Sequence, residues 1–214
     1  RKDAKAIAKI LEESYDFKVQ LLLDPTRREI LKALAEYRLK LTKKDNFLIY
    51  YAGHGWQDKD ADMGYWLPSD AEEGSNVDWI RIASITSELR AMEANHAMIV
   101  ADSCYSGVLT RGLSIRQKKP NYYDKMTKKK ARVVLTSGGL EPVMDQGSST
   151  GHSVFASAFL KALSENRAVL DGSELFVKIR RPIALNSNQT PEFSDIRNAG
   201  LDDSGGDFFF VRRK

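Results

Sequence analysis

The 214-residue sequence has only one cysteine, Cys104, and three histidines. A single cysteine excludes an intramolecular disulfide and any metal site built from several thiolates, and it is typical of a reducing compartment. We therefore expect a cytoplasmic protein in which Cys104 serves packing, regulation or chemistry.

Long apolar runs are also missing. No run approaches the ~18 residues that a membrane span needs. The N-terminal residues Arg1–Tyr15 have the periodicity of an amphipathic helix and not the pattern of a signal sequence. We expect no membrane partner.

A net basic charge is absent from most of the chain, although the pI is near 9.0. Between Arg111 and Arg132 there are nine Lys or Arg and one acid, so this stretch carries +8 while the formal net charge is only +4. The rest of the chain is therefore acidic. Because the basic residues gather in one loop-like stretch and not on a face, a nucleic-acid partner is not indicated.

The composition that remains is that of an ordinary globular protein, with 42% hydrophobic and 29% charged residues. Its length suits one domain. Helical patterns alternate with apolar, strand-like runs, which predicts an α/β domain with a mostly parallel central sheet flanked by helices. The predicted strands are 17–24, 45–53, 96–104, 131–139 and 207–213, with a short strand and turn in "GYWLPSDA"; the predicted helices are 1–15, 26–40, 82–94, 153–163 and a segment from 173 onwards.

His54 and Cys104 each follow a predicted strand, His54 within "YYAGHG" and Cys104 within "DSCYSG". Strands of a parallel sheet end at one edge, so the two side chains can meet there. An imidazole that removes the proton of a thiol creates a nucleophile for acyl transfer through a thioester. The backbone N–H groups of Gly55 and Cys104 are candidates for the oxyanion hole.

Simpler interpretations stay open for each residue alone. A lone cysteine at a strand end is more often buried packing than a nucleophile. A lone histidine after a strand is more often a hydrogen-bonded surface residue. The pair, about 50 residues apart, favours catalysis.

The two motifs resemble the histidine and cysteine motifs of caspase-like cysteine peptidases, in particular the metacaspase, paracaspase and bacterial branch. The resemblance extends through "RVVLTSGG", "HSVFASAFLKAL" and "QTPEF" to "GGDFFFV". It implies the caspase-like fold with an antiparallel last strand, a His54–Cys104 dyad, and hydrolysis of peptide bonds in protein or peptide substrates. It also implies a large-subunit-like part (1–110), a connecting stretch (111–131) and a small-subunit-like part (132–214). Because the first predicted element is a helix, the family's first strand is expected to be missing, with the loop that helps line the specificity pocket.

Three acids predict which bond is cut. Asp102 lies two residues before the cysteine, and Glu141 and Asp145 follow the "RVVLTSGG" strand, where caspases place a pocket arginine. An acidic pocket attracts Lys or Arg and repels aspartate. We expect cleavage after Arg or Lys, with Asp102 as the main determinant, as in metacaspases and paracaspases. Asp102 as a turn cap, and Glu141 and Asp145 as solvated loop charge, are the alternatives.

The basic stretch, 111–131, offers many Lys and Arg bonds, so self-processing there is one hypothesis and an inconsequential solvated loop is the other. The acidic run "DKDADMG" does not fit an EF-hand, because the positions that require Gly and Glu hold Met63 and Ser69. No metal site and no required cofactor are therefore expected. Calcium activation, known for some metacaspases, stays open but has no matched site in this sequence. His152 is interpreted as a cap-region or packing residue, and His96 as a strand residue.

Two other functions compete with an endopeptidase. One is a catalytically silent caspase-like interaction module, although such proteins usually lose the histidine or the cysteine. The other is a nucleic-acid-binding domain, which would depend on Lys118, Lys119 and Lys128 to Lys130. An upstream sensor, a regulatory domain or a partner that activates the enzyme is consistent with the resemblance.

Overall fold

The computed structural model describes residues 1–103, 109, 121–138, 151–201 and 205–213. A four-stranded sheet forms its centre, in the order β1-β5-β6-β8. Strands β1, β5 and β6 are parallel, and β8 lies antiparallel at the edge beside β6. These strands are β1 (Asn46–Ala52), β5 (His96–Asp102), β6 (Ala131–Thr136) and β8 (Glu192–Asp195).

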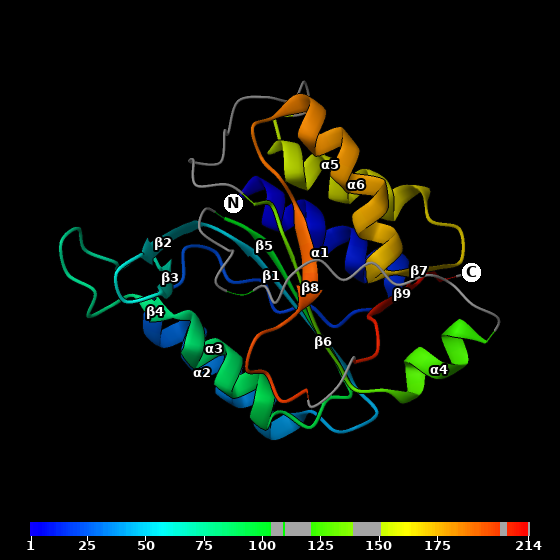
Figure 1. The fold of residues 1–214 in the computed structure, drawn as a ribbon, viewed down its shortest axis with the longest axis horizontal. Helices are drawn as coiled ribbons and strands as arrows, with labels where there is room; N and C mark the ends of the chain where they lie inside the picture. The colour runs from blue at the N-terminus through cyan, green and yellow to red at the C-terminus, as the bar shows by residue number, and fades with distance from the viewer. Residues whose placement is uncertain (104–108, 110–120, 139–150, 202–204, 214) are drawn as a thin grey trace.

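Helices cover both faces of this sheet (Figure 1). Met98 and Val100 of β5 point into a core shared with α1, α5 and α6, whereas Ile99 and Ala101 point into the core under α2 and α3. Every residue of β5 and β6 is buried, as expected for central parallel strands. The predicted α/β architecture is confirmed. The helices are α1 (Lys2–Tyr15), α2 (Arg27–Lys40), α3 (Ile82–Ala91), α5 (Val154–Glu165) and α6 (Gly172–Asn186).

Two smaller sheets and one more helix complete the described part of the chain. The antiparallel strands β2 (His54–Asp58), β3 (Met63–Leu67) and β4 (Ile80–Arg81) form one sheet. The second sheet pairs β7 (Val169–Asp171) with β9 (Phe209–Val211), and α4 (Tyr122–Lys128) precedes β6. No helix among the described residues combines the length and apolarity that crossing a membrane requires.

The strand predicted at 17–24 is wrong. The segment has no strand assignment, and Leu21, Leu22 and Leu23 are 42%, 36% and 40% exposed. A strand needs a neighbour that satisfies its backbone groups, and β1 pairs only with β5 among the described strands. Apolar, β-prone residues therefore do not suffice to make a strand here.

Two smaller expectations also need correction, although His54 follows β1 as predicted and opens β2. Part of the basic stretch is helical, since α4 occupies Tyr122–Lys128. Strand β8 was not predicted, and the predicted closing strand, β9, pairs with β7 and not with the central sheet.

Arg132 was counted with the loop charge, but it is fully buried in β6. Its guanidinium donates to main-chain carbonyl oxygens around the end of α3, and burial lowers the pKa of Arg132 to about 10. The acceptors are the carbonyl oxygens of Leu89, Met92, Ala94, Asn95 and Ala131. Arg132 therefore contributes to folding and not to a basic surface.

Candidate active site at the carboxyl edge of the sheet

The two motifs leave neighbouring strands at the same edge of the sheet. In the parallel pair of β1 and β5, Ala52 is the register partner of Asp102, so the chain leaves both strands at the same level. His54 follows Ala52 by two residues, and Cys104 follows Asp102 by two. Cys104 lies outside the described residues, so its contact with His54 stays a prediction.

The backbone of His54 is held by a hydrogen bond from Tyr51. The Tyr51 hydroxyl donates to the carbonyl oxygen of His54 over 2.7 Å, and its ring stacks on Trp66 with centroids 4.0 Å apart. Burial raises the pKa of Tyr51, so its hydroxyl stays protonated as a donor. A Cβ at position 53 would lie 2.7 Å from the Tyr51 hydroxyl oxygen, so only glycine leaves this contact undisturbed.

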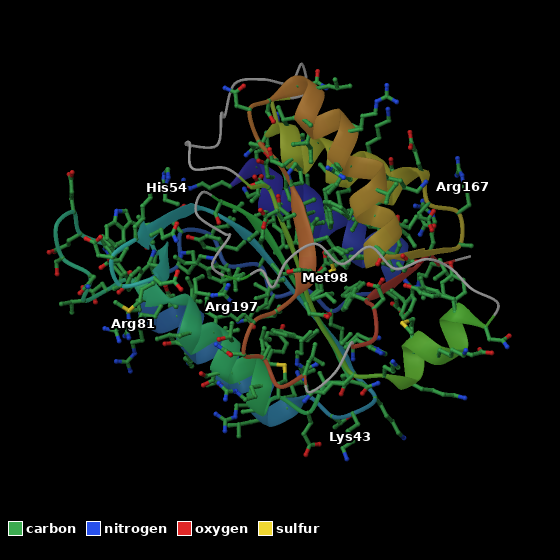
Figure 2. All side chains as sticks on the ribbon, in the orientation of Figure 1. Lys43, His54, Arg81, Met98, Arg167 and Arg197 are labelled. Atoms are coloured by element: carbon green, nitrogen blue, oxygen red, sulfur yellow. The ribbon has the colours of Figure 1, made fainter. Side chains whose placement is uncertain are left out.

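The imidazole of His54 is exposed at this edge. Figure 2 shows Lys43 and His54 on opposite sides of the molecule, as expected for residues that flank the two ends of β1. Gly55 is half-buried and pairs with Trp66 across the β2–β3 hairpin. The predicted role of Gly55 in an oxyanion hole is untested.

The residue before Cys104 is held by the segment that follows strand β6. Ser103 is buried, and its carbonyl oxygen accepts a hydrogen bond from the Ser137 hydroxyl over 3.3 Å. Gly138 continues this segment at a φ of +69°, and a Cβ there would lie 1.8 Å from the carbonyl oxygen of Thr190. Ser137 and Gly138 therefore provide a small donor to Ser103 and a close backbone approach to Thr190.

Asp102 ends β5 and is only 4% exposed. Its Oδ2 accepts a hydrogen bond from the Ser153 hydroxyl over 2.5 Å. Ser153 is the N-cap of α5, and its N–H donates to Asp3 Oδ2 over 3.3 Å. Asp3 also lies 2.5 Å from Nδ1 of His152. The expected cap-region position of His152 is confirmed.

Tyr50 brings a further polar group to this edge. Its hydroxyl oxygen is buried and has no hydrogen-bond partner in the described part of the chain. Burial raises the pKa of Tyr50 well above its ordinary value, and the charges of Asp102 and Asp3 raise it further. Two carboxylates and a neutral phenol therefore lie within electrostatic reach of one another.

Glu141 and Asp145, the other predicted pocket residues, lie outside the described residues. In the acidic run, Asp58 accepts the N–H groups of Asp60 and Ala61 and so shapes the hairpin turn between β2 and β3. Among the described residues, no group of three or more His, Cys, Asp or Glu side chains is arranged to hold a metal ion.

Comparison with known proteins places this arrangement in a family. A family model described as "Caspase domain" matches residues 1–199. The chain belongs to the caspase-domain family. This is a family of cysteine peptidases, and the sequence resemblance is confirmed.

Solved structures agree on the fold of this caspase domain. A crystal structure of a protein from Geobacter sulfurreducens matches with 19% identity and a TM-score of 0.61, covering 94% of this chain and 86% of that one. Caspase-1 from Spodoptera frugiperda matches with 15% identity and a TM-score of 0.61, covering 91% and 77% of the two chains. None of the curated proteins compared matches significantly.

The sequence pattern did not identify Asp3, Tyr50 or Ser153 as neighbours of the site. Asp3 lies in a helix whose polar residues look solvated, and Tyr50 lies in an apolar strand run. Ser153 alone had a local signal, since a serine before an apolar helical pattern is typical of an N-cap. No local sequence pattern indicates the hydrogen bond from Ser153 to Asp102.

Proposed function

We propose that this caspase domain is a cysteine endopeptidase that cuts peptide bonds after Arg or Lys. The observation that carries the proposal is the register of β1 and β5, which brings the ends of the two motif-bearing strands together. Family membership supports the reaction class.

In the proposed mechanism His54 removes the proton of the Cys104 thiol. The thiolate attacks the carbonyl carbon of the scissile peptide bond, and the resulting oxyanion accepts hydrogen bonds from the N–H groups of Gly55 and Cys104. His54 then gives its proton to the leaving amine, which leaves a thioester. Water, deprotonated by His54, hydrolyses the thioester and releases Cys104 as a thiol. These steps use side chains and backbone amides alone, so we expect activity to persist in a chelator.

Asp102 is the proposed determinant of the basic preference, with Glu141 and Asp145 as further candidates. Its buried carboxylate offers a charge that a substrate guanidinium or ammonium neutralises, whereas an aspartate side chain would be repelled. Asp3 adds a second carboxylate beside Asp102, since both accept a hydrogen bond from Ser153. This supports a pocket that selects cations.

Self-processing in the basic stretch is part of the same proposal. Bonds near its end are expected to resist cleavage, because Gly206 donates to the Lys130 carbonyl oxygen and the Ala131 N–H donates to Asn95. A protease needs extended, accessible backbone, so we expect cuts to fall before Tyr122. Mass spectrometry of the purified protein locates them.

A peptide panel tests the function. Wild type, His54→Ala and Cys104→Ala are compared on peptides with Arg, Lys, Gln or Asp before the scissile bond. We expect hydrolysis after Arg and Lys that both substitutions abolish. If the wild type shows no cleavage that depends on His54 and Cys104, a catalytically silent interaction module is favoured.

A further inference from the structure

The hydroxyl of Ser153 joins the α5 helix to the candidate specificity residue. Its oxygen accepts the N–H of Ala156 over 2.9 Å, as an N-cap does, and its proton is donated to Asp102 Oδ2 over 2.5 Å. A serine hydroxyl has one proton to donate. With the oxygen already accepting from the helix, that proton is committed to Asp102.

This contact matters because Asp102 is a buried carboxylate. Removing a carboxylate from water disfavours its charged form unless nearby donors compensate. The Ser153 hydroxyl is such a donor, and the positive end of the α5 dipole acts in the same direction. Both act against the burial of Asp102 and the like charge of Asp3, and so favour the ionised form, which is the one that binds a cation.

Ser153 is itself held in place by residues from α1 and from the turn before α5. Its N–H donates to Asp3 Oδ2, and Asp3 Oδ1 contacts His152. Ser153 is 3% exposed. The hydroxyl therefore has little freedom to turn away from Asp102.

We infer that Ser153 is a positioning residue for substrate selection, which keeps Asp102 charged and oriented toward the basic side chain of the substrate. This inference rests on the proposed function, since it requires Asp102 to contact that side chain. It adds a residue about 50 positions from the cysteine motif to the determinants of specificity.

Two substitutions separate this role from helix capping. Ser153→Gly removes the hydroxyl, yet glycine is an acceptable N-cap and so leaves α5 largely intact. Ser153→Thr keeps both the donor and the cap. The readout is the ratio of kcat/KM for an arginine peptide to kcat/KM for the same peptide with citrulline, which has nearly the same shape and no charge.

For Ser153→Gly we expect the arginine-to-citrulline ratio to fall about tenfold, mainly through a higher KM for the arginine peptide, because the contact is made on binding. For Ser153→Thr we expect a ratio within about twofold of wild type. An equal loss on both peptides, or a threonine variant as impaired as the glycine variant, would overturn the inference.

A binding measurement in the Cys104→Ala background needs no catalysis. Fluorescence anisotropy compares labelled peptides that end in arginine or citrulline, and Ser153→Gly should weaken only the arginine peptide. Asp102→Asn in the same background is the reference. If Asp102→Asn removes the arginine preference and Ser153→Gly retains it, the inference is wrong and the specificity proposal stands. If Asp102→Asn retains the arginine preference, or if the wild type shows no such preference, the inference and the specificity proposal are both wrong.

Discussion

The two ends of the central parallel strands bury polar groups in different ways. At the amino end, the ring nitrogens of His96 lie 3.0 Å from Asn46 Oδ1 and 3.0 Å from the Lys129 carbonyl oxygen, and Arg132 binds carbonyl oxygens. At the carboxyl end, Asp102 binds a serine hydroxyl and the Tyr50 hydroxyl has no partner among the described residues. The difference teaches that burial alone does not mark a functional site. Polar groups at the amino end bond mostly to main-chain carbonyl oxygens, whereas at the carboxyl end the bonds are between side chains and the buried Tyr50 hydroxyl is left without a partner in the described part of the chain.

The largest effect is expected for Arg132, at the amino end of the parallel strands. Arg132→Met leaves several buried carbonyl oxygens without a donor, so we expect unfolding in urea to require about 3 kcal/mol less free energy. Arg132→Lys should lose less, because lysine keeps the charge and some donors. Peptidase activity measured where the variants are still folded should stay close to wild type. A large activity loss in a fully folded Arg132→Met would show that the two ends are coupled.

The second prediction concerns Asp102, at the carboxyl end of the parallel strands. Asp102→Asn keeps an oxygen that accepts from Ser153 but removes the charge. We expect the preference for arginine over citrulline peptides to fall about 100-fold, with little change in stability. Kinetics on the two peptides and a urea titration provide the measurements. An unchanged preference would assign the specificity to other residues.

A smaller effect is expected at Gly53. Gly53→Ala places a methyl group against the Tyr51 hydroxyl, which cannot withdraw easily because its ring stacks on Trp66. We expect kcat to fall about tenfold as the support of His54 shifts.

Tyr51→Leu is the control for that substitution, because it removes the hydroxyl oxygen and the ring atoms Cζ and Cε2 that the methyl group meets. In a double-mutant cycle, Gly53→Ala should cost less in the Tyr51→Leu background than in wild type. Equal costs in the two backgrounds would refute the steric explanation.

The smallest effect is the pH dependence of stability caused by His96, at the amino end of the parallel strands. Burial lowers the pKa of His96, so the unfolded chain binds the proton more readily than the folded chain does. Stability should therefore be greatest above the ordinary histidine pKa of about 6.5 and decline as pH falls below it. Urea titrations between about pH 5 and 7 should show a weaker pH dependence for His96→Asn than for wild type. Identical slopes would assign the dependence to other groups.

Much of the fold could be predicted because hydrophobic periodicity is local. The buried runs in β1, β5 and β6 and the apolar stripe of α5 are visible in short windows of sequence. The segment 17–24 has similar residues but no strand partner, so its prediction failed. The Asp195–Val133 pairing of β8 likewise joins residues distant in the chain, which no local pattern reveals.

The sequence by itself determined the two motifs, their positions after buried strands and the capping residue of α5, since each depends on neighbours within a few residues. Only the tertiary structure decided which polar groups meet. Ser153 reaches Asp102 across 51 residues and Asp3 across 150. Such contacts arise because α1 and α5 pack on the same face of the sheet, which brings their amino-terminal ends to the end of β5. Local periodicity does not indicate that arrangement.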